Sequence, residues 1–250
     1  TETGYGQVKP ILTPRYTPTC TDACMEGLQV LSEKYQVPVQ SHLSEGLDEI
    51  EWVKQLKPGL SCYGEAYDMY DLLGSRQPAV MAHVVHPNEA EYELIKHRNV
   101  LVAHCPQSNT NAANGVAPIL QMVHDGIRVG LGTDMAGGYN LNLLRTMTDA
   151  IQASKLRWCF TERNGDPFAK KNFLTVANAF YLATKGGGSF FGKVGSFEPD
   201  YEFDAVVLDD AALADFVERP LQDRFQRILW LHTADTVTAK FIQGTCVYQA

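Results

Sequence analysis

The sequence predicts an α/β protein in which part of a (β/α)8 TIM barrel is followed by a small β appendage. In the first half, short apolar runs rich in β-branched residues alternate with longer amphipathic stretches, the pattern of βα units around a parallel sheet. Four of these five runs end in a His or an acidic residue, and the carboxyl ends of barrel strands are where active sites lie. After about residue 195 the pattern changes to the alternation of half-buried antiparallel strands.

The apolar runs give the strands of the predicted barrel. They are Val8–Pro14, Val37–Glu45, Ala79–His86, Val100–Pro106 and Arg128–Asp134. A closed barrel of this class needs eight strands, so the sequence contains about five of the eight.

The stretches between the runs are predicted helices. Thr21 followed by Asp22 is a cap signal, Pro87 suits a first helical turn, and Gly126 marks a helix end. The predicted ranges are Thr21–Gln36, Gly46–Lys57, Pro87–Arg98, Val116–Asp125, a short helix within 58–78, and two longer stretches at about 141–158 and 171–184.

The last part of the chain predicts a separate small unit. FDAVVLD at 203–209 and TVTAKFIQGTCVYQA at 236–250 alternate as antiparallel strands do, with a turn at Gly244. We therefore expect residues 1–195 to form the partial barrel. Residues 196–250 are expected to form strands of a small β-sandwich domain with one helix.

Composition excludes several function classes. The 250 residues carry a net charge of −8 and no Lys/Arg cluster, which weighs against nucleic acid as a partner. No segment has the apolar length that spans a bilayer, and TETGYGQVKP lacks the features of a signal peptide, so we expect a cytoplasmic protein without a membrane partner. The six scattered cysteines are predicted to be reduced thiols.

Polar residues at the ends of apolar strands predict a metal site. His42 with Glu45, His83, His104 and Asp134 fall at such ends. Because these ends meet at one face of a barrel, the side chains should lie together. Two imidazoles and a carboxylate are typical zinc ligands, and a further carboxylate can move protons.

Each of these residues also has a purely structural interpretation. His104 and His86 could be core or capping histidines, Asp134 could cap the Gly-rich turn that follows it, and Glu45 could be a first-turn helix residue. An acidic residue that ends an apolar strand is nevertheless costly unless it is paired or metal-bound. Their recurrence at matched strand ends favours a functional site.

The motifs around these residues identify a family resemblance. QSHLSE, VMAH and GLGTDMAGG resemble the strand-five, strand-six and strand-eight signatures of the amidohydrolase superfamily. KPILTPRYTPTC, AHCPQSN and FEPDYEFDAVVLD resemble its guanine deaminases in particular, and the resemblance covers nearly the whole chain.

This resemblance implies roles for individual residues. His42 and Asp134 would be zinc ligands, and His83 would lie in the coordination sphere or beside it, in hydrogen-bonding reach of the attacking water. Glu45 would be the proton shuttle. Arg15 would hold the carbonyl edge of a purine, while Tyr16 would pack on its ring.

The sequence also departs from the family pattern. Val84 stands where the family usually has Gly after the strand-six His, and His86 follows. None of the seven His residues forms the His-x-His pair that supplies two further ligands in this superfamily. We therefore expect the sequence to be the C-terminal part of a longer protein, with zinc short of its usual four ligands in the chain as given.

The implied activity is zinc-dependent hydrolytic deamination of guanine to xanthine and ammonia, by a homodimer. Two alternatives stay open. One is a related hydrolase that acts on another aminopurine, an oxidised guanine, a pterin or a triazine. The other is a non-catalytic scaffold protein. The presence of Glu45 together with His42, His83 and Asp134 argues against this alternative.

Overall fold

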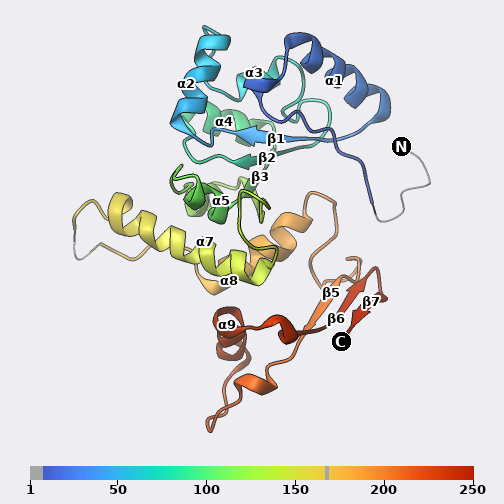
Figure 1. The fold of residues 1–250 in the computed structure, drawn as a ribbon, viewed down its shortest axis with the longest axis vertical. Coiled ribbons are helices and arrows are strands. Elements are labelled where there is room, and N and C mark those ends of the chain that lie inside the picture. Colours follow the sequence, from blue (N-terminus) through green and yellow to red (C-terminus); the bar gives the residue numbers. More distant parts are fainter. Residues whose placement is uncertain (1–7, 167–168) are drawn as a thin grey trace.

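The computed structural model describes residues 8–166 and 169–250 and contains two sheets. A four-stranded parallel sheet has the order β1-β2-β3-β4, and a three-stranded sheet has the order β5-β6-β7. The parallel strands are β1 (Val39–Leu43), β2 (Ala79–His83), β3 (Leu101–His104) and β4 (Arg128–Leu131). The antiparallel strands are β5 (Ala205–Leu208), β6 (Val237–Ile242) and β7 (Thr245–Gln249). Figure 1 shows the small sheet at the end of the molecule opposite to helices α1–α3.

The parallel sheet confirms four of the predicted strands. Its register pairs Val39 with Ala79 and Leu43 with His83, so β1 and β2 end level with each other. Sequential order of parallel strands requires a crossover after each strand, and helices supply most of these crossovers. The carboxyl ends of all four strands therefore lie along one edge.

The first predicted strand, Val8–Pro14, is wrong as a full strand. Within it only Leu12 forms a parallel bridge, with Val39, where Leu12 N donates to Pro38 O at 2.9 Å and Gln40 N donates to Leu12 O at 2.9 Å. Proline has no N–H to donate, so Pro10 and Pro14 on either side of Leu12 prevent a longer ladder. The segment nevertheless runs beside β1.

The helices begin at identifiable caps. Thr21 accepts a hydrogen bond from Cys24 N, and Asn88 accepts one from Glu91 N, so each satisfies a free amide of a first turn. The α-helices are α1 (Asp22–Tyr35), α2 (Leu47–Leu56), α3 (Glu65–Asp68), α4 (Glu89–His97), α5 (Pro106–Asn111), α6 (Ile119–His124), α7 (Leu143–Arg157), α8 (Val176–Tyr181) and α9 (Leu221–Leu231). Short 3-10 segments are Thr17–Thr19, Ala211–Leu213 and Ala234–Thr236, and π-helical turns are Trp158–Glu162 and Leu182–Gly186.

The core lies between the parallel sheet and its helices. Leu43, Met81 and Val102 are fully buried on three neighbouring strands, and Tyr67 and Ile95 from α3 and α4 pack into the same cluster. Burial of apolar side chains of this size stabilises a fold by about 1.5–3 kcal/mol each. This packing holds the strands whose ends carry the polar residues.

The antiparallel sheet is much more exposed. Along β7 every residue is solvent-exposed, and the residues of β6 are either partly buried or exposed, with none fully buried. Helix α9 precedes this hairpin and packs against α7, and its Ile228 and Leu229 are buried. The strands and the helix agree with the predicted elements, while the domain boundary near residue 195 stays a prediction.

Within the described ranges, no helix combines the length and the apolar character needed to cross a bilayer. All six cysteines fall in this part of the chain, and each is a free thiol.

Candidate functional site

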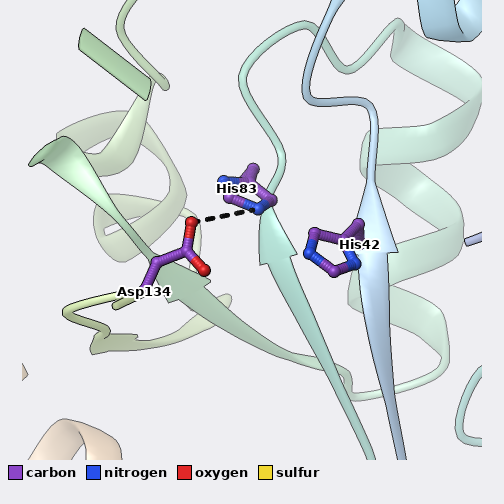
Figure 2. A group of neighbouring side chains, drawn as sticks. All are labelled: His42, His83 and Asp134. Atoms are coloured by element: carbon purple, nitrogen blue, oxygen red, sulfur yellow. Dashed lines mark ion pairs between the residues drawn. The ribbon is translucent and has the colours of Figure 1, made fainter. Parts of the chain in front are cut away.

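Three metal-type side chains meet at the carboxyl edge of the parallel sheet. His42 and His83 lie near the ends of β1 and β2, and Asp134 follows β4. One potential ligand atom from each lies within 4.8 Å of the other two. The two imidazole rings are stacked, with centroids 5.2 Å apart, and the Asp134 carboxylate faces them (Figure 2). The predicted convergence of these three residues is therefore present in the fold.

The His83 ring is held in one orientation by an amide. Its Nδ1 lies 2.8 Å from Asn109 Oδ1, and because an amide oxygen only accepts, Nδ1 carries the proton. The lone pair of Nε2 then faces Glu45 Oε2 at 3.5 Å and Asp134 Oδ2 at 3.9 Å. This nitrogen is buried and has no hydrogen-bond partner among the described residues, which leaves it free to coordinate a metal ion.

The His42 ring is oriented in the same manner by a backbone carbonyl. Its Nδ1 lies 2.5 Å from the carbonyl oxygen of Arg15, which can only accept. The proton is therefore on Nδ1, and Nε2 is the nitrogen available to a metal. Outer contacts of this kind fix the tautomer of metal-binding histidines and raise their basicity.

Asp134 lies in a tight turn that needs the two glycines following it. Gly138 N donates to Asp134 O at 2.6 Å, which closes the turn. A Cβ added to Gly137 would lie 2.8 Å from Asp134 Oδ2 and 3.1 Å from Ser108 Cβ. Only glycine at position 137 leaves the carboxylate where it is.

Glu45 lies beside the three residues rather than among them. Its side chain is 24% exposed; one oxygen accepts from Asn114 Nδ2 at 2.9 Å and the other faces His83. Its backbone N–H donates to Glu49 Oε2 at 3.2 Å, and Tyr63 holds the other Glu49 oxygen at 2.8 Å. Burial raises the pKa of Glu49, although these hydrogen bonds oppose the rise.

Backbone strain is concentrated at the same edge. Ser44, His83, Val84 and Asp134 all have positive φ, of 47°, 75°, 47° and 46°. A β-branched residue in this region costs about 1–2 kcal/mol. The structure thus explains why glycine suits the position of Val84, and the complete burial of the valine side chain offsets the strain.

Comparison with models of protein families identifies the family to which the chain belongs. The model described as "Amidohydrolase family" matches residues 2–229. The chain belongs to the amidohydrolase family.

Two curated relatives carry the name guanine deaminase. The chain is 36% identical to the guanine deaminase of Dictyostelium discoideum over 244 residues, which cover 95% of the chain and 52% of that protein. It is 37% identical to the probable guanine deaminase of Schizosaccharomyces pombe over 226 residues, covering 89% of the chain and 41% of that protein. The chain spans about half the length of the curated relatives it matches.

A solved structure agrees with this similarity. The guanine deaminase from C. acetobutylicum, with guanine bound in its active site, superposes with a TM-score of 0.89 at 43% identity. The match covers 96% of the chain and 56% of that structure. The α/β amidohydrolase fold with its four-stranded parallel sheet is therefore established.

In this amidohydrolase, Arg15 and Tyr16 lie next to the three metal-type residues. The guanidinium carbon of Arg15 is 5.2 Å from the Tyr16 ring centroid, and Arg15 is exposed and has no ion-pair partner within the described residues. The Tyr16 ring meets His42 edge-on at 6.5 Å and Trp52 at 6.4 Å. The fold thus places a cation and one aromatic ring beside His42, with Trp52 on Tyr16.

Two other histidines of the amidohydrolase lie outside the group of three. His104 is fully buried, and burial, with a smaller contribution from His83, lowers its pKa to about 3, so the ring is neutral. His86 instead lies with Nε2 at 2.5 Å from Asn114 O. Both fit the structural interpretations that the sequence left open.

Sequence reasoning missed the two asparagines that contact His83 and Glu45. Asn109 lies within the AHCPQSN motif, which resembled the family without suggesting a role, and Asn114 follows it. The motif was the available signal, because it follows a strand that ends beside His83.

Proposed function

We propose that this amidohydrolase catalyses the zinc-dependent hydrolytic deamination of guanine to xanthine and ammonia. The observation that carries the proposal is the convergence of His42, His83 and Asp134, with Glu45 only 3.5 Å from His83. The similarity to guanine deaminases, one of them with bound guanine, supports the choice of substrate.

The residues present fit a zinc ion. His42 and His83 would offer Nε2 and Asp134 a carboxylate oxygen, and imidazole with carboxylate is a common zinc ligand set. The buried Nε2 of His83 has no other partner among the described residues, as expected of a ligand atom. When bound, zinc acts as a Lewis acid that makes water a nucleophile near neutral pH.

Proton transfer is assigned to Glu45. Its free oxygen faces the site, where it takes a proton from the attacking water and delivers it to a ring nitrogen of the purine. The water oxygen forms a bond to C2, the bond from C2 to the amino nitrogen breaks, and ammonia leaves with the remaining water proton. With Nδ1 protonated, the one lone pair of His83 Nε2 is the donor offered to zinc, so orientation of the attacking water is assigned to the second carboxylate oxygen of Asp134.

Substrate choice is assigned to Arg15 and Tyr16. A guanidinium donates to the C6 carbonyl of guanine, whereas the C6 amino group that adenine has at the same position is itself a donor and cannot accept that bond. The Tyr16 ring provides an apolar face for the purine, beside Trp52. A panel containing guanine, adenine, a pterin and a triazine separates this proposal from the related hydrolases.

The test of the function measures zinc and ammonia together. We expect zinc-loaded protein to release ammonia from guanine, and Glu45→Gln to keep its zinc while turnover falls on the order of 100-fold or more. The exposed Glu26 provides the matched control, because Glu26→Gln should change neither quantity. Equal turnover by Glu45→Gln and the unsubstituted protein would overturn the role of Glu45, and zinc-loaded protein without guanine turnover would overturn the function.

Further parts of the proposal concern assembly and location. The four parallel strands and the Leu12 bridge would be neighbouring elements of a (β/α)8 barrel, with a boundary near residue 195 before the small β unit. A homodimeric state, which light scattering measures, and a cytoplasmic location remain predictions.

A further inference from the structure

The carboxylate of Glu45 is held by a side chain far away in the sequence. Asn114 Nδ2 donates to Glu45 Oε1 at 2.9 Å across a sequence separation of 69 residues. The second carboxylate oxygen faces His83 Nε2 at 3.5 Å. The amide therefore fixes one oxygen and directs the other toward the metal-type residues.

Asn114 is itself fixed through its backbone. Its N–H donates to Asn109 O at 2.9 Å, and its carbonyl accepts from His86 Nε2 at 2.5 Å. Since the carbonyl cannot donate, His86 carries a proton on Nε2. The contact to Glu45 thus starts from a backbone that is anchored on both sides of the residue.

His86 is fixed in turn by the strand end that carries Glu45. Its backbone N–H donates to Ser44 O at 3.1 Å, and Val85 N donates to the same oxygen at 3.0 Å. The left-handed turn at Val84 brings these two amides toward Ser44. A closed ring of contacts therefore runs from Ser44 through His86 and Asn114 back to Glu45.

A glycine makes room for this arrangement. A Cβ added to Gly46 would lie 3.3 Å from Asn114 Oδ1, closer than most real side-chain contacts. Gly46 has an ordinary negative φ, and the atom nearest to such a Cβ is Asp48 Oδ1 at 2.6 Å, so Asn114 is the second of two close neighbours that favour glycine here.

We propose that Asn114, anchored by His86, is a positioning residue that aims the Glu45 carboxylate during proton transfer. The inference rests on the proposed function, because it gives the contact a role in the chemistry assigned to Glu45. A shuttle that moves a proton from water to a ring nitrogen depends on orientation, and displacement of a catalytic group by about 1 Å can cost roughly 100-fold in rate. His86, which lies outside the group of three, thereby contributes through the backbone of Asn114 alone.

The first experiment separates positioning from a structural role by kinetics. Asn114→Ala keeps the carbonyl that His86 contacts and removes only the amide donor. We expect kcat to fall about 10- to 100-fold, with zinc content unchanged and KM within about twofold. In the Glu45→Gln background the same substitution should cost less than about twofold, because the group it aims is already inactive. Equal losses in both backgrounds would show a structural role and overturn the proposal.

Two further variants sharpen this test. Asn114→Asp keeps the shape but replaces the donor by a second carboxylate, so it should lose at least as much activity as Asn114→Ala. His86→Ala should give a smaller loss that disappears when Asn114 is already alanine. The exposed Asn172 supplies the control, and Asn172→Ala should match the unsubstituted protein.

The second experiment does not depend on turnover. The side-chain amide of Asn114, assigned in 15N NMR spectra by its absence in Asn114→Ala, should change its chemical shift in Glu45→Gln and stay unchanged in Glu26→Gln. A changed chemical shift in Glu45→Gln supports the contact between Asn114 and Glu45. It does so even if the protein fails to turn over guanine, and that failure would refute the proposed function alone. An unchanged resonance in Glu45→Gln refutes the contact and with it the positioning role.

Discussion

A buried carboxyl group outside the metal-type cluster gives a stability prediction with a defined sign. Glu91 on α4 is 1% exposed and accepts from Gly64 N at 2.8 Å. Burial raises its pKa from 4.5 to about 7, against the lowering effect of the Ser44 hydroxyl and the Gly64 amide. The folded protein therefore holds a proton on Glu91 at pH values where the unfolded chain has released it.

The direction of the pH dependence follows from this difference. A group whose pKa is raised by folding contributes stability that is complete below its unfolded pKa and is lost as the pH rises through its folded pKa. A rise from 4.5 to about 7 corresponds to roughly 3 kcal/mol in total. About 2.5 kcal/mol of this contribution disappears between about pH 5 and about pH 8.5.

Glu91→Gln tests this reasoning because glutamine is neutral throughout and its carbonyl can still accept from Gly64. We expect the free energy of unfolding of the variant, relative to the unsubstituted protein, to rise by about 2.5 kcal/mol between about pH 5 and about pH 8.5. Urea denaturation at several pH values measures this difference in the free energy of unfolding. Glu93→Gln on the exposed side of α4 is the control. A difference that does not change with pH, or a variant that is relatively less stable at the higher pH, would refute the reasoning.

Two predictions concern the metal-type residues themselves. Asn109→Ala removes the acceptor of His83 Nδ1, so zinc affinity measured by chelator competition should fall about 10- to 100-fold, and an unchanged affinity would contradict the tautomer assignment. Gly137→Ala places a Cβ 2.8 Å from Asp134 Oδ2, so zinc should bind at least about 10-fold more weakly. Gly27→Ala, which meets no atom within 4 Å, is the matched control, and equal zinc affinity in both variants would show that Asp134 can move without loss.

The parallel strands could be predicted because the residues that identify each strand are adjacent in the sequence. Apolar runs that end in His or Asp identified β1 to β4, since such residues at the end of a buried strand need a reason to be there. The run around Leu12 misled because its apolar residues suit a strand while the prolines beside it cannot donate to a ladder. Helix α5 was not predicted because proline is common both at the end of a strand and at the first position of a helix, and Pro106 was assigned to the strand.

The convergence of His42, His83 and Asp134 could be predicted from the sequence. The side chains that hold the residues of this site in place could not. The carboxyl ends of neighbouring parallel strands lie along one edge of the sheet, so residues at matched strand ends are expected to meet there. The contact between Asn114 and Glu45 joins distant segments through a neutral amide, which leaves no charge pattern or periodicity in the sequence. Such contacts depend on the tertiary fold alone.

The backbone of Arg15 has a consequence for how such a site can change over time. Its carbonyl orients His42, while its side chain extends from an exposed position toward the Tyr16 ring. Every residue at position 15 keeps a backbone carbonyl, so under the proposed function a substitution there would change the group offered to the substrate while the carbonyl contact to His42 stays available. A change of the Arg15 codon would therefore alter the proposed substrate contact without removing the backbone contact that orients His42.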